Sequence, residues 1–181
     1  MTLWLARHAQ PLVARGVCYG QLDMAAELQA TQRCAEALAK VLPAGMTGAS
    51  SPLQRCEQLA SVLITLRPDL TLKPELKLQE MNFGEWEGRA WSDIPRAELD
   101  AWTANFADCT VGQTGESSAQ FMARVASVFD ALPRDQDTLW ITHAGVIRAA
   151  QLLAGGVRRV DRADQWPMKA PAYGQWCKLR L

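Results

Sequence analysis

The chain has 181 residues, 49% of them hydrophobic, and its 19 basic and 19 acidic residues give a formal net charge of zero. This length suits one well-buried core and is short for two domains. A neutral chain has no global field to attract nucleic acid or an anionic membrane, and no apolar run approaches the roughly 18 residues that span a bilayer. We therefore expect a single cytoplasmic domain over residues 1–181, with no nucleic-acid or membrane partner.

The five cysteines are an odd number at wide, irregular spacing, with no CxxC pair and no zinc-ligand pattern. We expect them to be reduced thiols, and the N-terminus lacks the charged region of a signal peptide. The chain has only two histidines, without an HxxxH partner, which leaves too few nitrogen ligands for a transition metal. No metal and no other cofactor is expected.

In the first half of the chain, predicted strands alternate with helices. Residues 2–7 form a short apolar run that predicts a buried strand, and residues 24–42 carry apolar side chains at helical spacing. A short strand over 46–50 precedes a helix over 51–66, whose serine cap and following proline are typical of a helix start. Leucines alternate over 70–78 and predict a further strand.

The second half continues this alternation after the glycine-interrupted, aromatic loop "EMNFGEWEG". Helices are predicted over 91–106, 117–132 and 145–155, and strands over 138–142 and 174–181. Strands that alternate with helices of ten or more residues predict a three-layer α/β sandwich with a mostly parallel central sheet.

Both histidines follow predicted strands directly: His8 in "LARHAQ" and His143 in "TLWITHAG". Ligands bind at the carboxyl ends of the strands in such sheets, so neighbouring strands would bring the two imidazoles to one crevice. A lone histidine at a strand end is more often a satisfied structural residue than a catalyst. That both histidines occupy equivalent positions favours a functional site.

Arginines are placed to complete a phosphate pocket around these histidines. Arg7 precedes His8, and Arg55 lies in the first turn of a predicted helix, where side chains tilt back toward the helix N-terminus. That N-terminus also offers unpaired N–H groups, and the guanidinium fork suits phosphate oxygens. Taken singly, each arginine would be read as a solvated surface charge.

Four segments now carry a resemblance to a known family. "LARHAQ", "SSPLQRCEQLA", "LQEMNFGEWEG" and "THAGVIR", in this order and spacing, resemble the histidine phosphatase superfamily, also called phosphoglycerate mutase-like. The resemblance runs from Leu3 to about Ala154 and implies the phosphoglycerate mutase-like fold. The stretch "FGEWEG" is most similar to the alpha-ribazole phosphatase branch, which removes a phosphate during cobalamin nucleotide-loop assembly.

The resemblance implies a role for each of five residues. His8 is the nucleophile that is transiently phosphorylated, while Arg7, Arg55 and His143 hold the phosphoryl oxygens. Glu80 protonates the leaving alcohol and then activates water. These roles agree with the chemistry of the side chains, because neutral imidazole is a competent nucleophile near pH 7 and an alkoxide leaves poorly without an acid.

The loop that carries Glu80 contains two further carboxylates, Glu85 and Glu87, and any of the three can be a plain solvated residue. The spacing relative to "FG" favours Glu80 by resemblance. The aromatic residues Phe83 and Trp86 either shield the site or pack the loop onto the core.

The sequence departs from the family pattern after the nucleophile. Ala9 stands where many relatives have glycine, and Ala14 stands where a phosphate-binding asparagine is frequent. Further contacts to the substrate are expected from Gln10, Tyr19, Gly20, Gln21 and Ala144. Ser117 is either a rim residue or a helix cap, and Trp91 and Trp102 either stack on a substrate ring or belong to the core.

The leading hypothesis is a cofactor-independent phosphomonoesterase for a small organic phosphate, with alpha-ribazole 5′-phosphate as the first candidate. A phosphate or sulfate ion fits such a site, and a homodimer is compatible with the sequence. Two other enzymes stay open, a phosphoglycerate mutase-type phosphotransferase and a protein phosphohistidine phosphatase. A non-catalytic protein that binds a phosphorylated ligand is the alternative from another class.

Overall fold

The computed structural model describes all residues from 1 to 181, and its centre is one five-stranded sheet. The strands are β1 (Thr2–Arg7), β2 (Thr47–Ser50), β3 (Thr71–Pro74), β4 (Thr138–Thr142) and β5 (Trp176–Arg180), in the order β3-β2-β4-β1-β5. All neighbouring pairs are parallel except β5, which runs antiparallel to β1 at one edge. This confirms the predicted α/β fold with a mostly parallel sheet.

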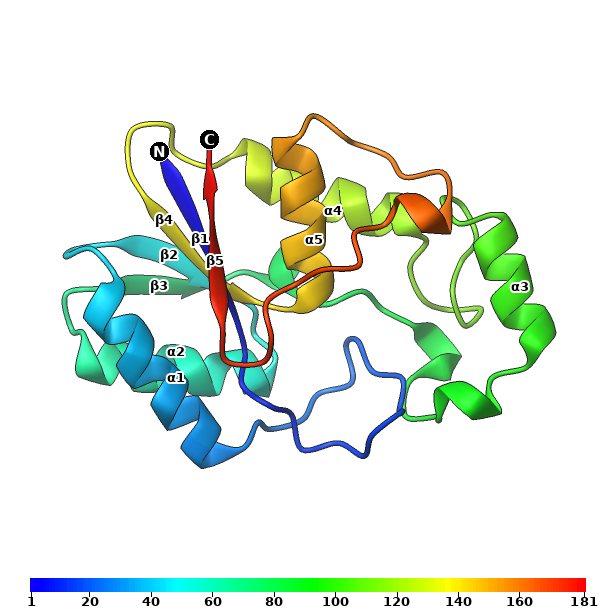
Figure 1. Ribbon diagram of the computed structural model, residues 1–181, viewed down its shortest axis with the longest axis horizontal. Helices are drawn as coiled ribbons and strands as arrows, with labels where there is room; N and C mark the ends of the chain where they lie inside the picture. Colours follow the sequence, from blue (N-terminus) through cyan, green and yellow to red (C-terminus); the bar gives the residue numbers. More distant parts are fainter.

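Helices cover both faces of the sheet (Figure 1). They are α1 (Leu28–Val41), α2 (Gln54–Leu66), α3 (Arg96–Ala104), α4 (Ser118–Asp130) and α5 (Ala144–Ala154). Because side chains alternate along a strand, Leu3 and Leu5 of β1 join the core under α4 and α5, while Trp4 and Ala6 join the core under α1 and α2. Helix α3 lies apart from both layers, on the side where the carboxyl ends of β1 and β4 open (Figure 1).

The start of α2 differs from the prediction. The helix begins at Gln54 and not at Pro52, and Ser51 does not act as its cap. Asp23 takes that role from a distant loop, because its carboxylate accepts hydrogen bonds from the backbone and side-chain amides of Gln54 at 2.8 and 3.1 Å. The Ser51 hydroxyl instead contacts Nε2 of His143 at 2.8 Å. The N-terminus of α2, which was predicted to offer unpaired N–H groups, is therefore occupied by the Asp23 carboxylate.

Other element boundaries move for local reasons. Helix α1 starts at Leu28, four residues later than expected, because the Glu27 carboxylate accepts the backbone N–H groups of the first turn. The predicted helix over 91–106 is interrupted before Pro95, so that only Arg96–Ala104 is α-helical.

The predicted strand over 70–78 stops at Pro74, and a 3₁₀ turn, Leu76–Leu78, follows it. The Ser117 cap of α4 is confirmed as a reciprocal capping box with Gln120. All five cysteines are free thiols. No helix is long and apolar enough to cross a membrane.

Candidate active site

The two histidines meet at one edge of the sheet. Strands β1 and β4 are adjacent and pair Arg7 with Thr142, so His8 and His143 follow at equivalent positions. The backbone N–H of His8 donates to the Thr142 carbonyl at 3.1 Å, and the two imidazole centroids lie 5.1 Å apart. Both rings line the same cavity, as the strand positions predict.

Two arginines at this cavity have unused hydrogen-bond donors. Arg55 is fully buried, and its terminal nitrogens donate to the carbonyls of Leu22 and Gly20 at 3.0 and 2.5 Å. Arg7 donates to the carbonyl of Pro171 at 2.9 Å. The Nε–H of each arginine is buried without a partner, a cost of about 1–3 kcal/mol for such a group. A bound oxyanion would supply acceptors to both.

The His8 imidazole is held in its neutral form. Its Nδ1 lies 2.7 Å from the Ala9 carbonyl, which can only accept, so Nδ1 carries the proton and Nε2 keeps its lone pair. Burial, together with the positive charge of Arg55, lowers the pKa of His8 to about 3. Burial also lowers the pKa of His143 well below its ordinary value. Neither ring is charged near neutral pH.

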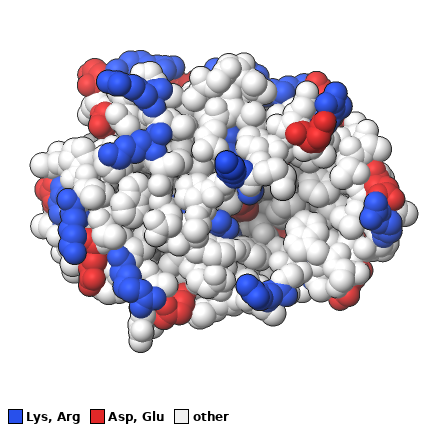
Figure 2. Space-filling model, viewed as in Figure 1, with Lys and Arg blue, Asp and Glu red and all other residues white.

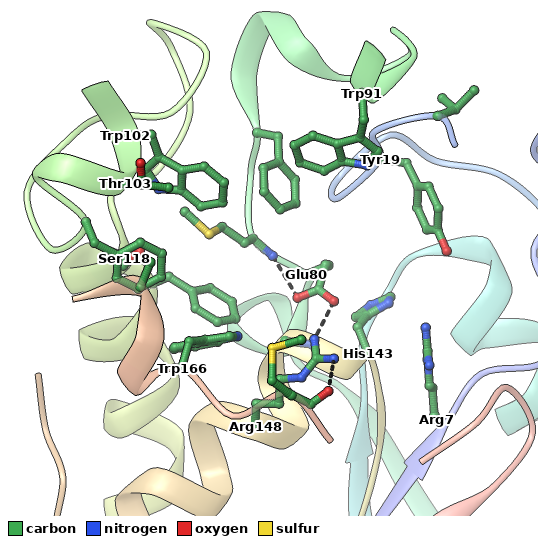
Figure 3. Close-up of a pocket in the computed structure, with 18 of the residues that line it drawn as sticks. Arg7, Tyr19, Glu80, Trp91, Trp102, Thr103, Ser118, His143, Arg148 and Trp166 are labelled. Carbon is green, nitrogen blue, oxygen red and sulfur yellow. Dashed lines mark hydrogen bonds between the residues drawn. The ribbon is translucent and has the colours of Figure 1, made fainter. Parts of the chain in front are cut away.

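Glu80 is the only acidic residue that lines the cavity. Its Oε2 accepts the backbone N–H of Gly145 at 2.9 Å, and its Oε1 accepts that of Met81 at 3.0 Å. Figure 3 shows Arg7 and His143 on one side of this carboxylate and Trp102, Ser118 and Trp166 on the other. The carboxylate thus lies where the cationic end of the cavity meets the apolar end.

The structure separates Glu80 from the two other carboxylates of its loop. Glu85 is exposed and does not line the cavity. Glu87 holds two loops together, because its carboxylate accepts the backbone N–H groups of Gln21 and Phe83, each at 2.9 Å, and that of Leu22. Neither carboxylate is placed to exchange a proton with a group in the cavity.

A half-buried arginine that the sequence did not point to fixes the segment before Glu80. Arg124 of α4 donates to the backbone carbonyls of Lys77, Gln79 and Glu80 at 2.7–3.2 Å. It also forms a two-point ion pair with Glu116, with both distances 2.7 Å. An arginine within an amphipathic helix gives no local signal of such a role.

The other end of the cavity, whose total volume is about 370 Å³, is walled by aromatic side chains. They are Phe83, Trp91, Trp102, Phe106, Phe121 and Trp166. Trp91 and Trp102 thus line the cavity, whereas Trp86 is a core residue with 2% exposure. Figure 2 shows a hollow in the middle of this face, with basic and acidic groups at its bottom.

The predicted rim residues separate into two groups. Tyr19 lines the cavity, but Gln10, Gly20, Gln21 and Ala144 do not. Gln10 is exposed, and Ala144 is buried at the start of α5. The Gly20 carbonyl accepts a hydrogen bond from Arg55. The Gln21 side chain donates to the backbone carbonyl of Glu80 at 3.2 Å. Gly20 and Gln21 therefore help to position Arg55 and Glu80 without lining the cavity themselves.

Tyr173 and Arg148 also belong to the site and were not expected. The Tyr173 ring lies 5.6 Å from the His8 ring and 3.9 Å from the Arg7 guanidinium, and its hydroxyl is 2.5 Å from that of Tyr19. Tyr173 follows the stretch that carried the resemblance, so no motif pointed to it. Arg148 lines the cavity from α5 and is the last residue of the "THAGVIR" motif.

The burial of two neutral histidines predicts a loss of stability in acid. The unfolded chain binds protons at a histidine pKa of about 6.5, whereas the folded pKa values are lower, so the free energy of unfolding falls as the pH drops below 6.5. Between pH 7 and pH 5 we expect each histidine to contribute a loss of about 2 kcal/mol. Urea denaturation at both pH values measures it. His143→Gln should show about half of the histidine-dependent loss, and an unchanged pH dependence in this variant contradicts the prediction.

Gly145 provides a local test of the Glu80 position. A Cβ at this residue would lie 2.1 Å from Glu80 Oε1. Gly145→Ala should therefore displace the carboxylate and lower kcat/KM by about 10²-fold, within the range for a lost acid–base catalyst. The fold should persist, because alanine favours helix by about 1 kcal/mol. Gly155→Ala, whose Cβ meets nothing closer than 3.4 Å, is the matched control. Equal kcat/KM in the two variants would count against this position for Glu80.

No group of three or more His, Cys, Asp or Glu side chains is close enough to hold a metal ion. The positive charges at the site are arginines, arranged around a neutral histidine with a free Nε2. Such a set of side chains offers hydrogen-bond donors and positive charge suited to the oxygens of a phosphoryl group.

Comparison with known proteins assigns the family. The sequence matches the histidine phosphatase superfamily (branch 1) over residues 3–179. The chain belongs to the histidine phosphatase superfamily. A comparison with functionally curated proteins finds no significant match.

Solved structures share the fold over almost the whole chain. A mycobacterial glucosyl-3-phosphoglycerate phosphatase has 24% identity and a TM-score of 0.77, covering 98% of this chain and 88% of its own. The alpha-ribazole phosphatase from Shigella flexneri has 22% identity and a TM-score of 0.79, covering 100% and 91%. A Thermus thermophilus protein has 26% identity and a TM-score of 0.74, covering 99% and 93%.

Proposed function

We propose that the protein is a metal-independent phosphomonoesterase that hydrolyses a small organic phosphate through a phosphohistidine on His8. One observation carries the proposal. A buried, neutral imidazole with a free Nε2 lines the same cavity as two arginines with unpartnered N–H groups and a single carboxylate. The arginines supply the positive charge that stabilises a transferring phosphoryl group.

In the first step, Nε2 of His8 attacks phosphorus and the ester P–O bond breaks. Arg7, Arg55 and His143 hold the non-bridging oxygens, while Glu80 donates a proton to the leaving alcohol oxygen. In the second step, the Glu80 carboxylate takes a proton from the water that attacks the phosphohistidine. The P–N bond breaks, inorganic phosphate leaves, and His8 returns to its neutral form.

For the substrate we propose alpha-ribazole 5′-phosphate as the first candidate, which would place the protein in cobalamin biosynthesis. Two observations support this choice. The fold is similar to that of the Shigella alpha-ribazole phosphatase, and the end of the cavity beyond Glu80 is aromatic, as a benzimidazole ring would require. The five free cysteines support a cytoplasmic location.

A hydrolysis screen tests the proposal. The purified protein is incubated with some dozens of phosphate esters, including ribazole phosphate, phosphoglycerates and a phosphohistidine protein, with and without a chelator. We expect release of phosphate from small esters at a rate that the chelator does not change. Binding of inorganic phosphate without hydrolysis of any ester would instead identify a non-catalytic phospholigand-binding protein.

A further inference from the structure

Glu80 lies on irregular backbone, although the proposed chemistry needs its carboxylate at one fixed point. The 3₁₀ turn over Leu76–Leu78 ends before it, and the next short turn begins only at Gly84. Inside the cavity the carboxylate accepts two backbone N–H groups, those of Met81 and Gly145 (dashed lines in Figure 3). Catalysis is sensitive to such placement, because a displacement of about 1 Å can reduce a rate about 10²-fold. The backbone of this segment therefore needs a support outside the cavity.

Arg124 of α4 holds the backbone on the N-terminal side of Glu80. Its Nη1 donates to the carbonyls of Lys77 and Gln79 at 2.7 and 3.0 Å, and its Nη2 donates to that of Glu80 at 3.2 Å. Its Nε and Nη2 donate to the two carboxylate oxygens of Glu116, each at 2.7 Å. These five bonds use all five N–H groups of the guanidinium, which a lysine with three donors cannot reproduce.

Glu116 holds the backbone on the C-terminal side of Glu80. Its Oε2 accepts the N–H of Asn82 at 3.0 Å, and its own backbone N–H donates to the Asn82 carbonyl at 2.9 Å. The side chains of Arg124 and Glu116 are only 18% and 19% exposed, so solvent and salt screen this ion pair less than a surface pair. Neither residue lines the cavity. The ion pair thus supports the chain on both sides of Glu80 without facing the substrate.

We propose that Arg124 and Glu116 are positioning residues for the proton transfers of Glu80. They act on the reaction only through the backbone of residues 77–82, which fixes how far the carboxylate reaches toward the leaving oxygen and the attacking water. The cationic end of the cavity does not depend on them. Damage to the ion pair should therefore slow the steps that need a proton transfer and spare the others. This inference rests on the proposed phosphomonoesterase function and adds two residues outside the cavity to it.

Arg124→Lys tests this role because it keeps the positive charge but removes the planar fork. We expect kcat/KM for the best alkyl phosphate of the screen to fall about 10- to 10²-fold. The first turnover of 4-nitrophenyl phosphate should stay within about threefold of wild type, because 4-nitrophenolate leaves without a proton. Glu116→Gln breaks the same ion pair from the other side and should show the same selective loss. Equal slowing of both esters in a variant that circular dichroism shows to be folded would overturn the positioning role.

Arg158→Lys is the matched control. Arg158 forms a two-point ion pair with Asp130, the last residue of α4, with both distances 2.8 Å, and neither residue lines the cavity. The substitution weakens a comparable ion pair on the same helix but leaves residues 77–82 untouched. Rates with both esters should stay within about twofold of wild type. A selective loss as large as that of Arg124→Lys would count against a specific link to Glu80.

A double-mutant cycle shows whether Arg124 acts through Glu80. In the Glu80→Gln background, adding Arg124→Lys should lower kcat/KM for the alkyl phosphate by less than about twofold, because the group that Arg124 positions is already inactive. A further loss as large as the one in the otherwise wild-type protein would overturn the inference.

An NMR measurement keeps this inference separable from the proposed function. The backbone amide protons of Met81 and Gly145 report on the carboxylate directly, since both are donated to it. In Arg124→Lys we expect both signals to move toward their positions in Glu80→Ala, and in Arg158→Lys we expect them to stay in place. Unchanged signals in Arg124→Lys overturn the positioning role even in a protein that hydrolyses nothing, whereas the phosphomonoesterase function fails only if no ester releases phosphate.

Discussion

Replacing His8 with alanine is expected to lower kcat by about 10⁴-fold or more, because the atom that forms the covalent bond to phosphorus is removed. The arginines around the ring stay in place, so binding of inorganic phosphate should persist. Release of phosphate from the best ester of the screen, under saturating conditions, measures the loss.

His143→Gln is the informative comparison for this variant. It removes a contact to a phosphoryl oxygen but leaves the nucleophile, so we expect a smaller loss of about 10- to 10³-fold. Circular dichroism and thermal unfolding at pH 7 establish that both variants fold. A His8→Ala protein that turns over at the same rate as His143→Gln contradicts the assignment of the nucleophile.

Glu80→Gln is expected to slow the hydrolysis of alkyl phosphates by about 10²–10⁴-fold, because glutamine cannot protonate the leaving oxygen or activate water. The effect should depend on the ester. 4-Nitrophenolate leaves without a proton, so the first equivalent should be released from 4-nitrophenyl phosphate at nearly the wild-type rate. Slow turnover should follow this burst, since the phosphohistidine then waits for an unassisted water. Rapid-mixing absorbance measurements resolve the two phases.

The exposed residue Glu85 provides the control for this experiment. Glu85→Gln removes the same charge from the same loop but not from the cavity, and its rates should stay within about twofold of wild type. An equal slowing of the first turnover for alkyl and nitrophenyl esters in Glu80→Gln would indicate that the carboxylate is not the acid.

Local patterns predict the centre of this fold well. The strands that carry His8 and His143 are short apolar runs buried on both faces, and parallel strands bring their carboxyl ends to the same edge. The meeting of the two imidazoles therefore follows from pattern and topology. Arg55 reaches the same place because a side chain in a first helical turn points back toward the sheet edge.

Contacts between distant segments account for what the sequence could not show. Ser51 has the residue type and position of a helix cap, but Asp23 takes the cap and Ser51 pairs with His143. The three carboxylates of the "EMNFGEWEG" loop are equivalent in composition, and only the folded loop directs Glu80 alone into the cavity. Tyr173 comes from a segment without helical or strand periodicity.

The central claim is that His8 carries the phosphoryl group between substrate and water. The most direct measurement is peptide mass spectrometry of Glu80→Gln after one burst with 4-nitrophenyl phosphate and an alkaline quench, which preserves phosphohistidine. We predict one phosphoryl group per chain, on the peptide that contains His8 and absent when His8 is also replaced. Phosphate release by an active protein in which no His8 peptide ever carries a phosphoryl group would contradict the account.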